Sequence, residues 1–298
     1  MRLINKVLLR IARQSDWYNN IVFQDCTKFW GIRDYDIDII NLGSNSAKFA
    51  FDYSDCNLTG KNWAMGPQSL MMDLSILQSH YSFLKQGATV IIPLCPFSCL
   101  VGYDYSYFSD KYYTVLNHSQ IPCFNLHKRI LMNDIKLNPH RYIPAVELVK
   151  TILSKLKIKK NNVIPCDFDK DSERFIKQWK EQFFIKDFDD DWSLLNQNSY
   201  MESKEILHKI TDFCKRYGFT PVIVMPPVSS SLKKCFSNKA LEKCVVNYVK
   251  EAVGNSVLFL NYLDCKLFDD NSLFANSYFL NSSGAKLFTK QVLNDLKY

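Results

Sequence analysis

Two serines beside a glycine are the first residues of this sequence that could do covalent chemistry. Gly43, Ser44, Asn45 and Ser46 follow a short apolar segment, and a serine hydroxyl at such a turn can attack an ester carbonyl when a base takes its proton. Backbone N–H groups or an asparagine amide would then hold the oxyanion. An imidazole is the usual base, and the chain has five: His80, His118, His127, His140 and His208.

A second set of residues suits binding better than catalysis. The amide of Asn45 can donate to a carbonyl or hydroxyl, and Phe279 can stack on the C–H face of a sugar ring. We expect Gly66 and Ser98 to line the same pocket. Packing of Phe279 in the apolar core is the alternative.

Alternating strands and helices must position these residues. Continuous apolar and β-branched runs predict strands over 36–42, 88–94, 220–225 and 256–260. Helical spacing of apolar residues predicts helices over 68–85, 201–217, 239–253 and 285–296. The order predicts an α/β fold, a mostly parallel, doubly wound, flavodoxin-like sheet of about five strands with helices on both faces. Ligands of such sheets bind beyond the carboxyl ends of the strands.

A long segment without strand signals, residues 117–198, lies between the second and third predicted strands. It contains two helical patterns, over 144–156 and 171–184. We interpret it as a mainly helical insertion that lies over the edge or the mouth of the sheet. The chain, residues 1–298, is then expected to form a single domain.

Residues 1–15 form an amphipathic pattern at helical spacing. Apolar residues from Leu3 to Ile11 fall on one face, and Arg and Lys residues fall on the opposite face. A basic amphipathic helix can lie in a membrane interface, where its cations meet anionic headgroups. The alternative is a helix docked on the protein's own core with a solvated basic side.

Several segments, taken in chain order, resemble blocks of the SGNH/GDSL hydrolase family. The first is NLGSNSAKFAFDY (41–53), and the second is NWAMGPQSL (62–70), in which the resemblance makes Gly66 an oxyanion donor. The last is NSYFLNSSGAKLFT (276–289). VIIPLCPFS (90–98) and PVIVMPPVSSS (221–231) resemble a subgroup of cell-envelope polymer synthesis, which includes D-alanyl transfer proteins of lipoteichoic acid and SGNH-like proteins of surface-polysaccharide gene clusters.

The positions that carry catalysis in this family hold other residues here. Aligned without gaps, the nucleophile position is Asn45, the histidine position is Phe279, and the aspartate position is Asn276. A one-residue shift of the turn would restore a nucleophile at Ser44 or Ser46, but no histidine falls in the final block. Loss of one triad member already costs several orders of magnitude in rate, so the site resembles one that binds without cleaving.

Three functions follow from this resemblance and from the residues. The first is an SGNH-like protein of surface-polysaccharide synthesis that has lost its hydrolytic machinery and binds a glycan or a lipid-linked saccharide, alongside polysaccharide-synthesis enzymes. The second is an active esterase or O-acyl(acetyl)transferase that uses Ser44 or Ser46 with an unrecognised base. The third is a membrane-associated scaffold that binds other proteins.

Composition limits the partners. The net charge is +7 and is spread along the chain, and no nucleic-acid-binding signature is present. The ten cysteines are scattered, without a C-x-x-C pair, so we expect no metal and no cofactor. No apolar run reaches the roughly 18 residues of a membrane-spanning helix, and no cleavable signal peptide is apparent. We expect a cytoplasmic protein, peripheral at the inner face of the membrane if residues 1–15 bind it.

Overall fold

The computed structural model describes residues 2–103, 108–156 and 166–298. The chain divides into two compact units: unit 1 is Met1–Arg33 with Phe108–Ile164, and unit 2 is Asp34–Tyr107 with Pro165–Tyr298. The sequence led us to expect one domain with an insertion over 117–198. The division falls inside that segment, because residues 117–164 belong to unit 1 and 165–198 to unit 2, and 157–165 lie outside the described residues.

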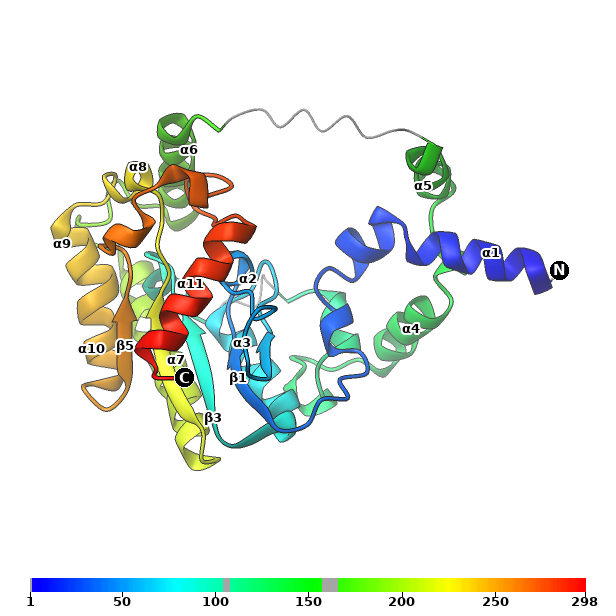
Figure 1. The fold of residues 1–298 in the computed structure, drawn as a ribbon, viewed down its shortest axis with the longest axis horizontal. Coiled ribbons are helices and arrows are strands. Elements are labelled where there is room, and N and C mark those ends of the chain that lie inside the picture. Colours follow the sequence, from blue (N-terminus) through cyan, green and yellow to red (C-terminus); the bar gives the residue numbers. More distant parts are fainter. Residues whose placement is uncertain (1, 104–107, 157–165) are drawn as a thin grey trace. The chain divides into compact units, whose positions relative to one another are not determined.

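Unit 2 contains a five-stranded sheet in which every pair of neighbours is parallel (Figure 1). The strand order is β2-β1-β3-β4-β5, which is the flavodoxin-like order, so the predicted fold class is confirmed. Ile39 of β1 pairs with Thr89 of β3, and Ile91 of β3 pairs with Val222 of β4. The strands are β1 (Ile37–Asn41), β2 (Gly60–Asn62), β3 (Leu84–Pro93), β4 (Thr220–Met225) and β5 (Leu258–Asn261).

Strand β2 is the element of the sheet that the sequence did not reveal. It is three residues long and only half-buried, so it lacks the apolar run that marks the other strands. Its Asn62 joins it to its neighbours, since the Asn62 Nδ2 donates to the Phe51 carbonyl at 2.9 Å and its Oδ1 accepts from Asn41 at 2.9 Å.

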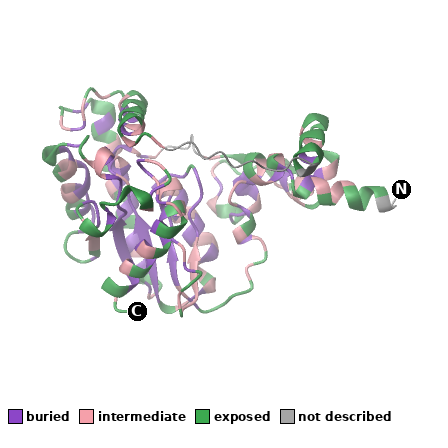
Figure 2. Ribbon diagram, turned by 45° about the horizontal axis from the view of Figure 1, so that its top comes forward, coloured by how far each residue is buried: buried purple, intermediate pink, exposed green. Residues whose placement is uncertain are grey.

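Helices cover both faces of this sheet, and the strands between them are buried (Figure 2). Helix α7 (Leu194–Arg216) lies against β4 and contacts α3 (Leu70–His80) and α10 (Tyr248–Val253). On the other face, α11 (Ser282–Asp295) contacts α2 (Asn45–Ala50), and its Phe288 and Val292 pack on Ile91 and Val224. The remaining α-helices of unit 2 are α6 (Phe168–Phe183), α8 (Ser230–Lys233) and α9 (Asn238–Leu241).

Unit 1 is built from helices and short turns in its described part. The helices are α1 (Arg2–Arg13), α4 (Leu126–Leu137) and α5 (Ala145–Leu156). Its small core centres on aromatic rings: the Phe23 ring lies 5.0 Å from the rings of Tyr18 and Trp30, and the Tyr18 hydroxyl donates to the Lys136 carbonyl at 2.9 Å. Within the described ranges, no helix of either unit is long and apolar enough to cross a membrane.

Single turns of other helix types complete both units. Two are π-helical, Trp17–Val22 and Glu242–Asn247. The 3-10 turns are Thr27–Phe29, Tyr81–Phe83, Ser98–Leu100, Asp110–Thr114, His118–Gln120, Pro139–Arg141, Lys266–Phe268 and Asn271–Leu273.

Candidate functional site

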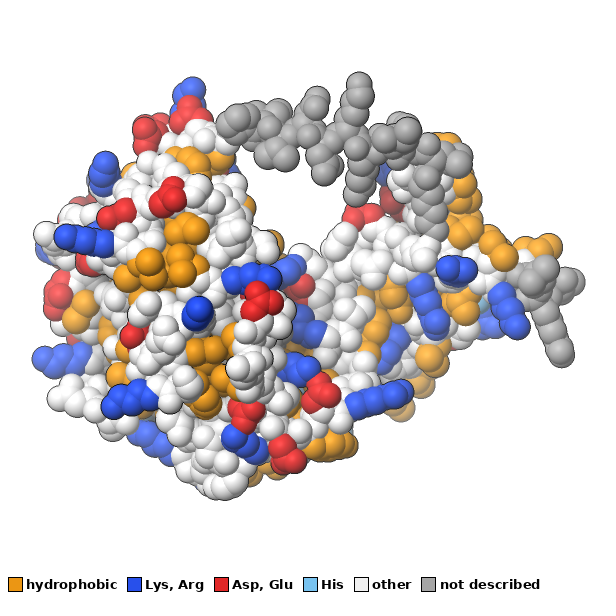
Figure 3. Space-filling view, in the orientation of Figure 1, with side chains coloured by type: hydrophobic (Ala, Val, Ile, Leu, Met, Phe, Trp, Pro, Cys, Tyr) orange, Lys and Arg blue, Asp and Glu red, His pale blue; other side chains and the backbone are white. Residues whose placement is uncertain are grey.

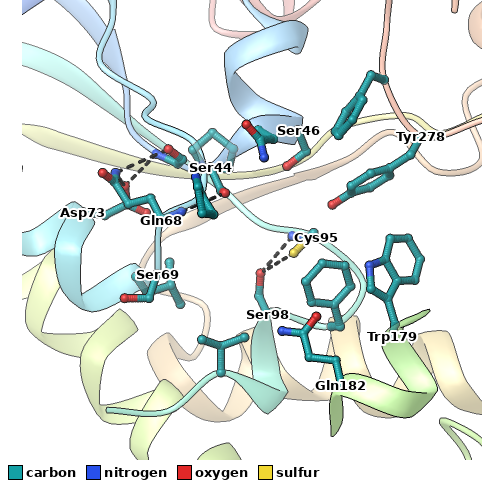
Figure 4. A pocket seen from close by; sticks show the side chains of 18 of the residues that line it. Ser44, Ser46, Gln68, Ser69, Asp73, Cys95, Ser98, Trp179, Gln182 and Tyr278 are labelled. Carbon is teal, nitrogen blue, oxygen red and sulfur yellow. Dashed lines mark hydrogen bonds between the residues drawn. The ribbon is translucent and has the colours of Figure 1, made fainter. Parts of the chain in front are cut away.

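A cavity of about 250 Å³ opens in unit 2 beyond the carboxyl ends of β1 and β3 (Figure 4). These two strands are neighbours in the sheet, and their connections leave toward opposite sides, which is the switch point where ligands of such sheets bind. The lining comes from three parts of unit 2: 43–46 with 67–73, 93–101 with 278–279, and one face of α6.

Hydrogen bonds hold the loop after β1 against the start of α3. The Gly43 N–H donates to the Asp73 carboxylate at 2.7 Å, and the Gln68 amide donates to the same carboxylate and to the Gly43 carbonyl at 3.3 Å. The Ser44 hydroxyl oxygen accepts from the Gln68 N–H at 3.0 Å. Gly43 has a φ of 109°, a conformation that favours glycine, so the turn that presents Ser44 depends on this residue.

Asp73 is the buried acid beneath this loop. Only 2% of the residue is exposed, and burial raises the pKa of its carboxyl from 3.8 to about 7, although the bonds from Gly43 and Gln68 act in the opposite direction. Its carboxylate accepts from the Gly43 N–H and from the Gln68 amide, and so holds the backbone of the loop. Asp73 therefore positions the loop.

A chain of hydroxyl and thiol groups crosses the floor of the cavity. The Tyr278 hydroxyl lies near Ser46 and the Cys95 thiol, both of which influence its pKa, and the Cys95 thiol lies 3.1 Å from the Ser98 hydroxyl (Figure 4). Burial is the largest cause that raises the pKa of both Tyr278 and Cys95. Both groups therefore keep their protons at neutral pH, and the cavity holds no thiolate that could act as a nucleophile.

Aromatic rings form the opposite wall. The Trp179 ring lies 5.5 Å from Phe175, 5.0 Å from Tyr278 and 4.6 Å from Phe97, and the Phe279 ring lies 4.8 Å from Tyr278. Phe175 and Trp179 are one turn apart on α6, and Gln182 follows on the same face. This helix thus carries both ring faces and an amide to the cavity.

The structure brings most of the predicted site residues to this cavity. Gly43, Ser44, Asn45, Ser46, Ser98 and Phe279 all line it. Phe279 is half-buried, and its ring contacts Phe49 at 5.1 Å and Phe175 at 6.1 Å, so it lies at the cavity wall.

Two predicted site residues play local roles instead. Gly66 lies so close to the Asn45 amide that a methyl group at position 66 would overlap the amide oxygen. Gly66 itself does not line the cavity. Asn276 accepts from the N–H groups of Tyr278 and Phe279 at 3.0 and 2.8 Å, and this shapes the turn that carries Phe279. It does not reach the cavity.

Several lining residues were missed by sequence reasoning, although some left a signal. Asp73 stands between Leu70 and Leu77 on the apolar face of its predicted helix, where a carboxyl is unusual. Cys95 directly follows β3, in a loop that the strand-end rule points to. Phe175, Trp179 and Gln182 show helical spacing, but nothing in that spacing indicates what the helix covers.

The ionisable side chains that line the cavity are the Asp73 carboxyl, the Cys95 thiol and the Tyr278 hydroxyl. Among its lining residues, all within the described part of the chain, there is no histidine, lysine or arginine. Over the described ranges, no group of three or more His, Cys, Asp or Glu side chains is placed to hold a metal ion. Two histidines of unit 2 lie elsewhere: His80 packs against Trp63, and His208 is paired with Asp212 on α7.

Comparison with known proteins does not assign this chain to a family. Neither a protein-family model nor a curated protein matches this sequence. The resemblance to SGNH/GDSL hydrolases therefore stays a prediction, and the geometry of the cavity carries the functional argument.

Proposed function

We propose that the cavity binds a saccharide, as a free glycan or as the sugar part of a lipid-linked intermediate of surface-polysaccharide synthesis, without cleaving it. The observation that carries the proposal is the pairing of an aromatic wall with a wall of amides and hydroxyls, with no imidazole or cationic side chain among the described residues that line the cavity. The resemblance to SGNH-like proteins with degenerate catalytic positions supports the same function.

The aromatic wall supports sugar binding through its size and its orientation. Phe175 and Trp179 stack with an interplanar angle of 28°, and Trp179, which is 6% exposed, backs an apolar wall on α6. The C–H faces of pyranose rings pack on such surfaces. Phe279 extends this surface at the position where the resembling family has its histidine.

The polar wall supplies the hydrogen-bonding groups that sugar hydroxyls need. Asn45, Gln68 and Gln182 bring amides to the lining, and Ser44 and Ser98 bring hydroxyls. These groups are neutral, so the pocket suits an uncharged sugar better than a phosphate or a carboxylate.

Hydrolysis is disfavoured by the partners of the two candidate nucleophiles. The Ser44 oxygen accepts a backbone N–H, and Ser46 lies near Tyr278, whose raised pKa keeps the phenol protonated at neutral pH and so unable to take a proton. No imidazole lines the cavity, and Asp73 is engaged with Gly43 and Gln68. A serine without a base retains little of the rate of a triad.

Binding is tested with an array of oligosaccharides from bacterial surface polymers, followed by calorimetry with the best-bound one. We expect Phe175→Ala to weaken that binding about tenfold, since an aromatic contact contributes about 1 kcal/mol beyond its buried area. Phe184→Ala is the matched control, because Phe184 ends the same helix but is 84% exposed and outside this cavity. Equal affinities of the two variants, or an array without any bound oligosaccharide, would overturn the proposal.

Catalysis is tested separately with a fluorophosphonate probe and mass spectrometry. We expect no adduct on Ser44 or Ser46 beside a labelled active hydrolase. An adduct on either serine that disappears when the protein is denatured would show an activated nucleophile, and the esterase or O-acyltransferase function would replace the non-catalytic one.

A further inference from the structure

The charge of this protein is divided unequally between its two units. Unit 1 has 16 Lys and Arg residues against 5 Asp and Glu residues, a net charge of +11. Unit 2 has 21 against 25, a net charge of −4. The overall charge of +7 thus conceals a strongly basic unit of about a third of the chain, which favours an anionic partner for unit 1.

Unit 1 also exposes apolar side chains along its helices. On α5, four residues with exposed fractions between 41% and 61% share one face at helical spacing: Val146, Val149, Ile152 and Leu153. On α4, three residues that are 59–60% exposed share another face: Leu126, Ile130 and Leu137. A helix that packs only against its own protein turns such a stripe inward.

Helix α1 is packed against unit 1 at its C-terminal end and exposed to solvent at its N-terminal end. Ala12 near its end is fully buried, and the helix contacts α5 and the turn Pro139–Arg141, so the docked alternative holds for its C-terminal half. Ile4 and Val7 in its first turns are 63% and 51% exposed, and Lys6 and Arg10 beside them are exposed as well. In Figure 3, hydrophobic side chains gather over α5 and α1, and Lys and Arg side chains lie beside them.

We propose that the α1–α5 surface, formed by Ile4, Val7, Val146, Val149, Ile152 and Leu153, binds the surface of an anionic phospholipid bilayer. The apolar side chains would enter the boundary between headgroups and acyl chains, and the cations of unit 1 would meet the anionic headgroups. This surface therefore extends the membrane contact from residues 1–15 to α5. The inference does not depend on what the cavity of unit 2 binds.

Charge decides between a bilayer and a second copy of the chain. A symmetric dimer through this surface would bring two units of +11 together, and like charges at an interface cost binding free energy. An anionic bilayer instead satisfies both the exposed apolar side chains and the positive charge. The apolar area and the cations on one short helix are also the features of interfacial helices.

The test is co-sedimentation of the full chain with phosphatidylcholine vesicles that contain phosphatidylglycerol, compared with phosphatidylcholine vesicles alone. We expect binding to the anionic vesicles, weakened by added salt, and about tenfold or more weaker for Lys6→Glu, which reverses one charge near the headgroups. Lys290→Glu makes the same change on an exposed residue of α11 and should leave binding unaltered.

The apolar part is tested by Val149→Asp, with Leu194→Asp as its control. Both residues are more than half exposed, one on α5 of unit 1 and the other at the start of α7 in unit 2, so both variants should fold. We expect about tenfold weaker vesicle binding for Val149→Asp alone. Equal binding of the two variants, equal binding to neutral and anionic vesicles, or a dimer in light scattering that Val149→Asp separates would overturn the proposal.

Discussion

In unit 2, alternating strands and helices turn their apolar residues inward, so that Ile39, Ile91 and Val224 are fully buried in the sheet. In unit 1, the described helices bury a few aromatic rings and leave stripes such as Val146 and Val149 in solvent. Unit 2 has a net negative charge and concentrates polar side chains at the carboxyl ends of its strands, whereas unit 1 is strongly basic.

The two units thus differ in where their apolar residues point. A sheet covered by helices on both faces buries its apolar residues in the core, and ligands bind in the crevice at the carboxyl ends of its strands. A unit without a sheet has apolar faces left for an external surface.

The largest effect should come from the buried carboxyl of unit 2. The pKa of Asp73 is raised to about 7 in the folded protein from an ordinary 3.8, so its contribution to stability is fully present below pH 4 and is lost as the pH rises to about 7. The loss is on the order of 4 kcal/mol. Asp73→Asn cannot titrate, and urea unfolding between pH 4 and pH 8 should show the native protein losing stability relative to this variant. A difference that stays constant with pH would contradict the raised pKa.

Removing an apolar side chain should cost stability in one unit only. Ile91 is fully buried in the central strand β3, and Ile91→Ala should lower the free energy of unfolding by about 3 kcal/mol, because it leaves a cavity in the core. Val149→Ala in unit 1 should change it by less than about 0.5 kcal/mol, since Val149 is 52% exposed. Urea titration of both variants measures the contrast, and a large loss for Val149→Ala would mean that this face is buried.

Helix capping should cost the same in both units, since it depends on local geometry alone. Asn125 accepts from the Lys128 N–H at 3.1 Å at the start of α4, and Ser193 accepts from the Asn196 N–H at 3.3 Å at the start of α7. Asn125→Ala and Ser193→Ala should each lower the free energy of unfolding by about 1 kcal/mol. If urea titration finds a loss for Ser193→Ala but none for Asn125→Ala, α4 does not begin at this cap.

The smallest effect should come from exposed ion pairs. Lys128 and Asp110 in unit 1 are 2.9 Å apart, and Lys286 and Asp55 in unit 2 are 2.8 Å apart, all four with side chains that are substantially exposed. Lys128→Ala and Lys286→Ala should leave the urea midpoint unchanged, because solvent screens both pairs. A shift for Lys128→Ala at low salt alone would indicate that the positive charge of unit 1 already strains its fold.

Local sequence was enough to predict most elements of unit 2. The strand expected over 220–225 is β4 with the same bounds, because a glycine ends the preceding helix and β-branched residues follow. The residues 43–46 reach the cavity because they directly follow a predicted strand, and chain connectivity puts them at its carboxyl end. Strand β2 and helix α4 were missed, since β2 is short and polar and the apolar residues of α4 face solvent.

The strand and helix pattern, the parallel sheet and the first loop of the site could be predicted from local sequence. That α6 brings Phe175 and Trp179 to that loop, from more than a hundred residues away along the chain, could not. Only the structure decided that the chain forms two units. The physical reason is that helical spacing records which residues share a face, whereas burial of that face depends on contacts between distant segments that no local pattern contains.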